Sequence, residues 1–160
     1  SPTGHSLVRD VMNKERALLG GELSGHIFFS DEYYGFDDAI YTSARLVSYL
    51  SRFKKTLSEI RKEIPTSVST PEIRIPCQDD SVKFSVVKKL KSMFKDKYAI
   101  NEIDGIRITF KGGWALIRAS NTEPVIVLRF EAQNKKLLTS YEKIVYEKLN
   151  KFKEIDLQWM

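Results

Sequence analysis

A glycine-rich loop at residues 20–26 gathers three side chains that can make polar contacts. It places the carboxylate of Glu22, the hydroxyl of Ser24 and the imidazole of His26 within five residues. Its three glycines let the backbone take positive φ and let a ligand approach closely. A carboxylate that accepts from vicinal hydroxyls, beside a serine, is the set of groups that a sugar needs. The alternative is structural: Glu22 and Ser24 cap a turn, and His26 satisfies the end of a buried strand.

A second polar loop at residues 118–124 lies between two strongly apolar segments. Arg118 supplies a planar fork of donors. Ser120 and Thr122 supply hydroxyls, and Asn121 supplies an amide. With the backbone N–H groups of a turn, these donors can converge on one tetrahedral anion, and phosphate fits that set. The loop is not a Walker A loop, because the Gly-rich spacing and its lysine are missing. The alternative is a polar hairpin turn that bonds its own backbone.

The first loop is predicted to lie between a helix and a short strand, with a second helix further along the chain. Residues 7–19 have a helical pattern, and residues 27–30 read as a short apolar strand after the loop. A further helix is expected to begin with Asp37 as its N-cap and Asp38 in its first turn. These elements, spread over roughly 60 residues, are too few to enclose a core. We therefore expect the back half of a domain that leaves apolar side chains uncovered, among them Phe28, Phe29, Val47 and Leu50.

A domain boundary is predicted after a short helical stretch at residues 56–63. Pro65 ends that stretch, and residues 66–71 form the best linker in the chain because they have no apolar period and end in proline. The boundary separates a domain over residues 1–66 from one over residues 67–160.

The second domain is predicted to combine hairpins with two helices. A strand at residues 72–75 precedes a helix at residues 82–94, and the pair Asp104-Gly105 predicts a hairpin with a type I′ turn, in which both residues take positive φ. Residues 114–119 and 125–131 read as strands joined by the second polar loop. The two helices carry apolar stripes: Val86, Val87, Leu90, Met93 and Phe94 in one, and Leu138, Tyr141, Val145, Leu149 and Phe152 in the other. This order predicts an α+β fold with an antiparallel sheet and helices on one face.

The net charge of +5 favours an anionic partner, either a phosphorylated metabolite or a nucleic acid. A nucleic-acid platform needs several aromatic residues on an open sheet face, and the only aromatic residues clearly in the later strands, Trp114 and Phe130, are better explained by core packing. Cys77, the single cysteine, is expected to be structural. Several lysines are expected on solvated helix faces: Lys83, Lys88, Lys89, Lys91, Lys95 and Lys97.

Two segment types that would place the chain at or across a membrane are missing from the sequence. It has no run of roughly 18 apolar residues, and its N-terminus lacks the basic-then-apolar order of a signal peptide. A cytoplasmic location, with no membrane partner, is the expectation.

Taken in order, five short motifs resemble the bacterial phosphomannomutase/phosphoglucomutases of the phosphohexomutase family. The motifs are TGHS at residues 3–6, GELSGH at residues 21–26, GFDD at residues 35–38, TPE at residues 70–72 and RASNTEP at residues 118–124. The resemblance implies the later part of the third of four domains, followed by a fourth domain with a TATA-binding-protein-like antiparallel sheet.

The resemblance also implies roles for single residues. Glu22 and Ser24 would hold sugar hydroxyls, and His26 and His5 would line the cleft near the transferring group. The phosphate at the far end of the substrate would be held by Arg118, Ser120, Asn121 and Thr122.

In this family a phosphoserine on the first domain donates to a hexose phosphate, and the 1,6-bisphosphosugar reorients before the serine takes back a phosphate. The resemblance implies Mg²⁺ on the second domain and glucose 1,6-bisphosphate as activator or intermediate. Mannose and glucose differ at C2, opposite the edge that the loop would read, so dual specificity is expected.

The serine loop and the Asp-Gly-Asp-Gly-Asp type of metal loop are missing from the 160 residues. We therefore expect this chain alone to be inactive and to require the N-terminal domains of its polypeptide. Ser1-Pro2 looks like a cut inside the third domain, whose exposed remnant is expected to self-associate. The alternatives are a non-catalytic phosphosugar-binding or nucleic-acid-binding module, and a regulatory or structural protein that kept the fold.

Overall fold

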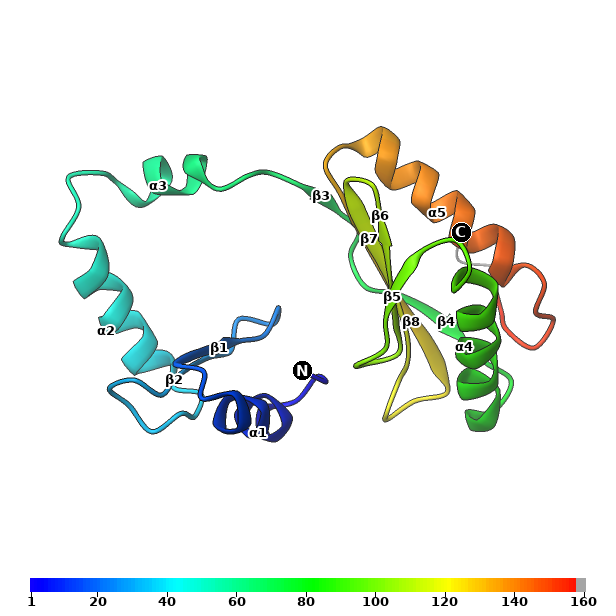
Figure 1. Cartoon of the computed structure of the whole chain (residues 1–160), viewed down its shortest axis with the longest axis horizontal. Helices are drawn as coiled ribbons and strands as arrows, with labels where there is room; N and C mark the ends of the chain where they lie inside the picture. The colour runs from blue at the N-terminus through cyan, green and yellow to red at the C-terminus, as the bar shows by residue number, and fades with distance from the viewer. Residues whose placement is uncertain (158–160) are drawn as a thin grey trace. The chain divides into compact units, whose positions relative to one another are not determined.

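The structure is a computed structural model that describes residues 1–157. The chain divides into two compact units, the first over Ser1–Pro65 and the second from Thr66 onward (Figure 1). The first unit contains a two-stranded sheet and the second a six-stranded one. None of the described helices is long and apolar enough to cross a membrane.

The first unit begins with a helix and a β-hairpin. Helix α1 covers His5–Glu15, and strands β1 (Leu19–Gly21) and β2 (Ile27–Phe29) pair antiparallel. The helix predicted over residues 7–19 is therefore too long. Arg16 takes a left-handed φ of 53°, which ends α1 and turns the chain into a strand that the sequence pattern did not indicate.

A small apolar cluster holds α1 against the hairpin. It consists of Val8, Met12 and Phe28, with Phe28 only 1% exposed. The expectation that Phe28 is uncovered is therefore wrong, because α1 packs over it. The expectation holds for helix α2 (Ala39–Leu50), which has no buried residue and leaves Val47 67% exposed.

The start of α2 differs from the prediction by one residue. Asp38, not Asp37, is the N-cap, and its carboxylate accepts the N–H of Tyr41 at 2.9 Å. Asp37 instead forms an isolated antiparallel bridge with Phe28. The carboxylate of Asp37 is therefore directed to the hairpin loop and not to the helix.

The segment between the units is shorter than predicted. Helix α3 (Leu57–Glu63) begins with a capping box, as its position after Thr56 suggests. Within the linker expected at residues 66–71, strand β3 (Val68–Ser69) pairs antiparallel with β8 (Val125–Ala132). A polar, proline-ended sequence can thus still contribute to a sheet edge when a neighbouring strand offers free backbone groups.

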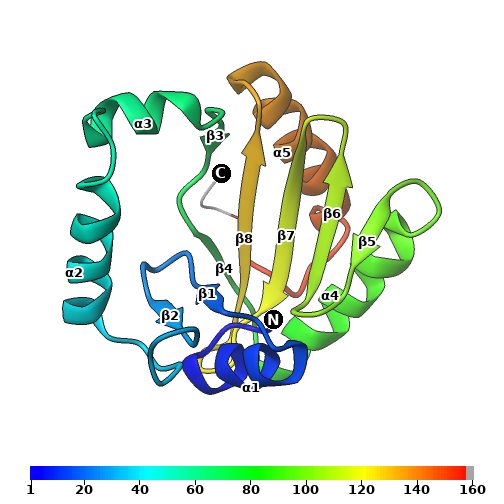
Figure 2. The same ribbon diagram turned by 60° about the vertical axis from the view of Figure 1, so that its left-hand side comes forward.

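The second unit has the predicted α+β architecture. Its sheet runs in the order β3-β8-β7-β6-β5, and β4 also pairs with β8 (Figure 2). Both helices cover the same face of this sheet, as the edge-on view of Figure 1 shows. The remaining elements are β4 (Ile73–Pro76), α4 (Asp80–Phe94), β5 (Ala99–Asn101), β6 (Ile106–Phe110), β7 (Gly113–Ala119) and α5 (Lys135–Leu149).

The predicted hairpin around Asp104-Gly105 is confirmed, since β5 and β6 pair antiparallel. The predicted type I′ turn is wrong, because only Gly105 has positive φ, at 72°. Four residues separate the paired strands, so a single left-handed glycine is enough to reverse the chain.

Alternation along the strands separates the two faces of the sheet. On the helix side, Ile126, Leu128 and Phe130 are fully buried. On the other side, Trp114 is only half-buried, and the Arg107 guanidinium carbon lies 4.9 Å from its ring centroid. Core packing therefore explains Phe130 but not Trp114.

The apolar stripes of the two helices agree with the prediction with one exception. Val86, Leu90 and Phe94 of α4 are buried, whereas Met93 is 36% exposed. The whole predicted stripe of the last helix is buried, although Phe152 lies beyond the end of α5: Leu138, Tyr141, Val145, Leu149 and Phe152.

Candidate functional site

The glycine-rich loop connects β1 to β2 as a tight hairpin. The N–H of Glu22 donates to the carbonyl of His26 at 2.9 Å, and the N–H of Gly25 donates to the carbonyl of Glu22 at 3.0 Å. Gly25 takes a φ of 94°, which a side chain would disfavour. Ser24 is exposed at the tip of this loop.

The Glu22 side chain turns back to the start of α1. One carboxylate oxygen accepts the N–H of Gly4 at 2.9 Å, and the other lies 3.6 Å from Nε2 of His5. Helix α1 has no side-chain cap of its own. The hairpin therefore supplies an anion where the helix dipole favours one.

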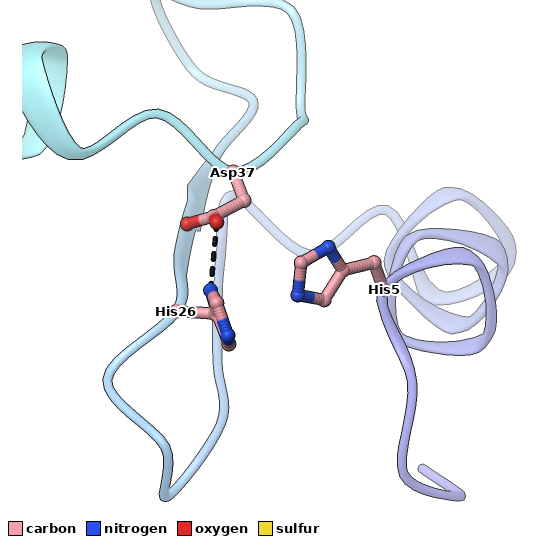
Figure 3. Close-up of side chains that lie close together, drawn as sticks. All are labelled: His5, His26 and Asp37. Carbon is pink, nitrogen blue, oxygen red and sulfur yellow. Dashed lines mark hydrogen bonds and ion pairs between the residues drawn. The ribbon is translucent and has the colours of Figure 1, made fainter.

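The two histidines of the chain meet beside an aspartate. The His26 Nδ1 lies 2.7 Å from an Asp37 oxygen, and the N–H of Ile27 donates to the other oxygen at 3.2 Å. The His5 and His26 ring centroids are 4.2 Å apart in an edge-on arrangement (Figure 3). The structure thus brings the predicted pair together and adds Asp37, which the sequence assigned to a helix cap.

A hollow of about 550 Å³ opens beside these groups. It is lined by His5, Arg9 and Asn13 of α1 together with Phe36 and Asp37, among others. Glu22 and Ser24, the predicted sugar contacts, do not line it. Of the two histidines, His5 lines this hollow and His26 does not.

The fold lowers the pKa of Asp37, chiefly through the hydrogen bond from His26 and further through the backbone N–H of Ile27. A carboxyl with a depressed folded-state pKa stabilises the fold above its ordinary pKa, and the contribution is lost as the pH falls through the folded value. We expect the stability of the first unit to fall less with decreasing pH in Asp37→Asn than in the parent chain. Unfolding followed through the amide signals of α1, from about pH 6 down to about pH 3, measures this.

Asp10→Asn, at an exposed position of α1, is the matched control for this pH experiment. It should leave the acid dependence of the first unit close to that of the parent chain. An Asp37→Asn curve that follows the parent curve at every pH would contradict the prediction.

The second polar loop joins β7 to β8 and is shaped by Ser120. Its hydroxyl oxygen accepts the N–H groups of Thr122 and Glu123, each at 3.3 Å, and its own N–H donates to Val125 at 3.0 Å. Ser120 is 6% exposed, whereas Asn121 and Thr122 are exposed at the tip. The serine therefore orders the loop, and its O–H hydrogen is still available as a donor.

Arg118 is held loosely at the base of this loop. Its side chain is 19% exposed, and an Nη atom lies 3.9 Å from a Glu72 oxygen. Arg74 makes the closer ion pairs with the neighbouring carboxylates, at 3.0 Å to Glu72 and 2.5 Å to Glu123. The acidic groups near the loop are thus paired by another arginine, which leaves the Arg118 fork available for an anion.

Lys83 corrects the expectation of a solvated lysine face. Its side chain is 2% exposed, and Nζ donates to the Glu123 carbonyl at 3.0 Å and to an Asp80 carboxylate oxygen at 2.5 Å. The residue lies on the buried face of α4, where an aliphatic stem packs well and the ammonium reaches the loop. A positive charge therefore lies beneath the second polar loop, a feature that no local pattern indicated.

We expect Lys83→Met to loosen this loop. The variant keeps the length of the side chain but removes the charged donor to the Glu123 carbonyl, which keeps the N–H of Val125. The loss of a hydrogen bond from a charged group costs about 1.5–3 kcal/mol. Hydrogen exchange of the amides of residues 120–125 should accelerate, and urea unfolding of the second unit should shift to lower concentrations. Lys88→Met, at an exposed position of the same helix, should change neither measurement. Unchanged loop exchange in Lys83→Met would contradict the prediction.

Cys77 is a buried free thiol whose pKa is raised by burial. A thiol with a raised pKa forms little of the reactive thiolate at neutral pH. Its environment therefore fits the structural role expected from the sequence.

Two family models together match most of the chain. Residues 1–68 match the alpha/beta/alpha domain III of phosphoglucomutase/phosphomannomutase, and residues 72–148 match the C-terminal domain of the same family. The chain therefore belongs to the phosphoglucomutase/phosphomannomutase family.

Curated relatives and a solved structure agree with this assignment. A phosphomannomutase/phosphoglucomutase of Pseudomonas syringae is 43% identical over 150 residues, covering 93% of this chain and 32% of the relative. A phosphoglucosamine mutase of Methanocaldococcus jannaschii is 38% identical over 154 residues, covering 92% and 34%. A phosphoglucomutase/phosphomannomutase family protein of Burkholderia thailandensis matches with a TM-score of 0.82 and 38% identity, over 93% of this chain and 31% of that chain. The chain thus spans about a third of the length of these proteins.

Proposed function

We propose that this chain is the substrate-recognition portion of a phosphohexomutase, which interconverts hexose 1-phosphate and hexose 6-phosphate through a phosphoserine and a 1,6-bisphosphate. The observation that carries the proposal is the loop at Arg118. Its guanidinium has a single long ion pair, its neighbouring acids are paired by Arg74, and its turn is ordered by a buried serine. Such a loop has the donors and the order needed to bind a phosphate dianion.

The loop at residues 118–124 would hold the phosphate that is not being transferred. Arg118 offers two parallel N–H donors to two phosphate oxygens, and the Ser120 hydroxyl donates its remaining hydrogen. Asn121 and Thr122 add donors from the exposed tip. Because these contacts recognise a tetrahedral anion and not a particular carbon, the loop accepts either phosphate of the sugar.

The first unit would read the sugar. Ser24 is exposed, and the Glu22 oxygen that faces His5 at 3.6 Å can accept from hydroxyls. When the Nδ1–H of neutral His26 donates to Asp37, Nε2 carries the lone pair and can take or return a proton near the transferring group. In this proposal Asp37 acts through His26 and is a positioning residue.

The proposal places the phosphoserine and Mg²⁺ on residues outside this chain. Mg²⁺ is held mainly by oxygen ligands, whereas the cluster described here has two imidazoles for one carboxylate, so that cluster does not fit it. When bound elsewhere, Mg²⁺ would assist phosphoryl transfer, and glucose 1,6-bisphosphate would serve as activator or intermediate. This chain alone, in a cytoplasmic setting, would bind mannose and glucose phosphates without turnover.

Amide-shift mapping tests the proposal. The chain is titrated in parallel with mannose 1-phosphate, glucose 1-phosphate and inorganic phosphate, and the same sample is assayed for mutase activity. We expect all three ligands to shift residues 118–123, the two sugars also to shift residues 22–26, and no turnover. Turnover by the chain alone, or hexose phosphates that shift neither loop, would contradict the proposal.

If the chain is instead a nucleic-acid-binding module, the same samples should give a different binding result. Trp114 is the only aromatic residue on the open face among β5–β8, and one ring beside Arg107 makes a poor platform for stacked bases. Steeply salt-dependent binding to an oligonucleotide, without binding to hexose phosphate, would favour that module.

Helix α2 supports the proposal that other parts of the polypeptide cover the first unit. Its apolar residues Ile40 and Val47 are 85% and 67% exposed. When those other parts of the polypeptide are absent, we expect the chain to self-associate through the exposed surface of α2. A single monomer boundary in sedimentation velocity, with no binding of an apolar dye, would contradict this expectation.

A further inference from the structure

We propose that His5, His26 and Asp37 form a binding site for a transition-metal dication of the Zn²⁺ and Co²⁺ class. One nitrogen or oxygen from each residue lies within 4.8 Å of those of the other two. The three side chains come from the start of α1, the end of the hairpin loop and the segment before α2, and they point toward one another (Figure 3).

The carboxylates around the imidazoles are already oriented by backbone groups. The Ile27 N–H donates to one Asp37 oxygen, which leaves the other directed at His26. The Gly4 N–H likewise holds one Glu22 oxygen, and the second lies 3.6 Å from Nε2 of His5. Hydrogen bonds that orient ligands in this way commonly strengthen a metal site, and Glu22 can serve as an orienting group for His5.

The donor set selects the class of metal. Two imidazole nitrogens and a carboxylate oxygen suit Zn²⁺, Co²⁺ and Ni²⁺, whereas Mg²⁺ and Ca²⁺ prefer oxygen donors alone. Three protein ligands leave a position for water, as in open zinc sites. The site borders the hollow lined by His5 and Asp37, through which an ion can enter.

Binding requires small movements that the surroundings permit. Zinc ligands lie about 2.0–2.2 Å from the ion, so ligand atoms must approach one another more closely than 4.8 Å. His5 is 54% exposed and can rotate toward His26. The ion replaces the proton between His26 and Asp37, and that proton passes to solvent, so affinity should fall at acidic pH.

This inference does not rest on the proposed function, and its test uses no phosphosugar. The chain, without a histidine tag, is titrated with Co²⁺ and followed by visible absorption, and Zn²⁺ is then added to displace it. We expect one Co²⁺ per chain, displacement by Zn²⁺, perturbed imidazole signals from both histidines and no response to Mg²⁺. Because the chain contains only two histidines, imidazole signals report this site alone.

Variants identify the ligands. His5→Ala, His26→Ala and Asp37→Asn should each weaken Co²⁺ binding by more than about 100-fold, which exceeds the 10- to 100-fold range typical of orienting groups. His5 is the variant least expected to disturb folding because its side chain is largely exposed. Asp96→Asn and Cys77→Ser, both in the second unit, should bind Co²⁺ as the parent chain does.

Two results would overturn the proposal. One is the failure of Co²⁺ and Zn²⁺ to bind with one-to-one stoichiometry, and the other is binding that survives His5→Ala unchanged. Either result leaves the phosphosugar titration untouched, so the two proposals fail separately.

Discussion

Replacing Arg118 with alanine is expected to abolish the response of this chain to inorganic phosphate and to hexose phosphates at concentrations that saturate the parent chain. A charge-assisted contact contributes about 1.5–3 kcal/mol, which corresponds to a loss of affinity of about 10- to 100-fold. The loss should be near the upper end, because Arg118 has only a 3.9 Å ion pair to give up when it binds an anion.

The measurement is the amide shift of residues 120–123 as phosphate is added. Arg118→Lys should retain part of the response, since it keeps the charge but not the planar fork. Arg107→Ala is the matched control, because it removes an exposed arginine from the neighbouring strand β6. Saturable shifts of the same residues in Arg118→Ala would show that the loop binds phosphate without its arginine, and the proposed clamp would be wrong.

Replacing Gly105 with alanine is expected to destabilise the second unit by about 2–5 kcal/mol. Gly105 has a φ of 72°, which costs an alanine roughly 1–2 kcal/mol. Its new Cβ would lie 2.4 Å from the Ile117 carbonyl oxygen and 2.7 Å from the Arg118 Cα. These are backbone contacts that cannot rotate away, and such overpacking adds about 1–3 kcal/mol.

The contacts at Ile117 and Arg118 would displace β7, the strand that carries Arg118. Gly105→Ala should therefore weaken phosphate binding as well as reduce stability. Gly112→Ala separates the two causes, since Gly112 has a φ of 88° but its new Cβ would meet mainly the flexible end of Gln133. It should lose stability through backbone strain alone and keep the phosphate response. Urea unfolding followed by the amide signals of β6–β8 tests both variants. Equal losses of stability and of phosphate response in the two variants would show that the contact of residue 105 with β7 does not matter for either property.

The second unit was largely predictable because its elements are built from local periodicity. Strands that bury one face alternate every second residue, and helices that cover a sheet repeat every three to four. Ile106, Ile108 and Phe110 in β6 follow the first rule, and Val86, Leu90 and Phe94 in α4 follow the second. Element ends were less predictable, because a single backbone angle such as that of Arg16 decides them.

The sequence by itself determined the two polar loops and the family to which they point, because each loop is a contiguous run of residues whose chemistry is visible without its surroundings. Only the tertiary structure decided which groups support those loops. Asp37 orients His26, the Gly4 N–H holds Glu22, and Lys83 reaches the Glu123 carbonyl. These contacts join residues that are 11, 18 and 40 positions apart. A hydrogen bond of this kind depends on where two segments meet in space, and no periodicity within either segment encodes it.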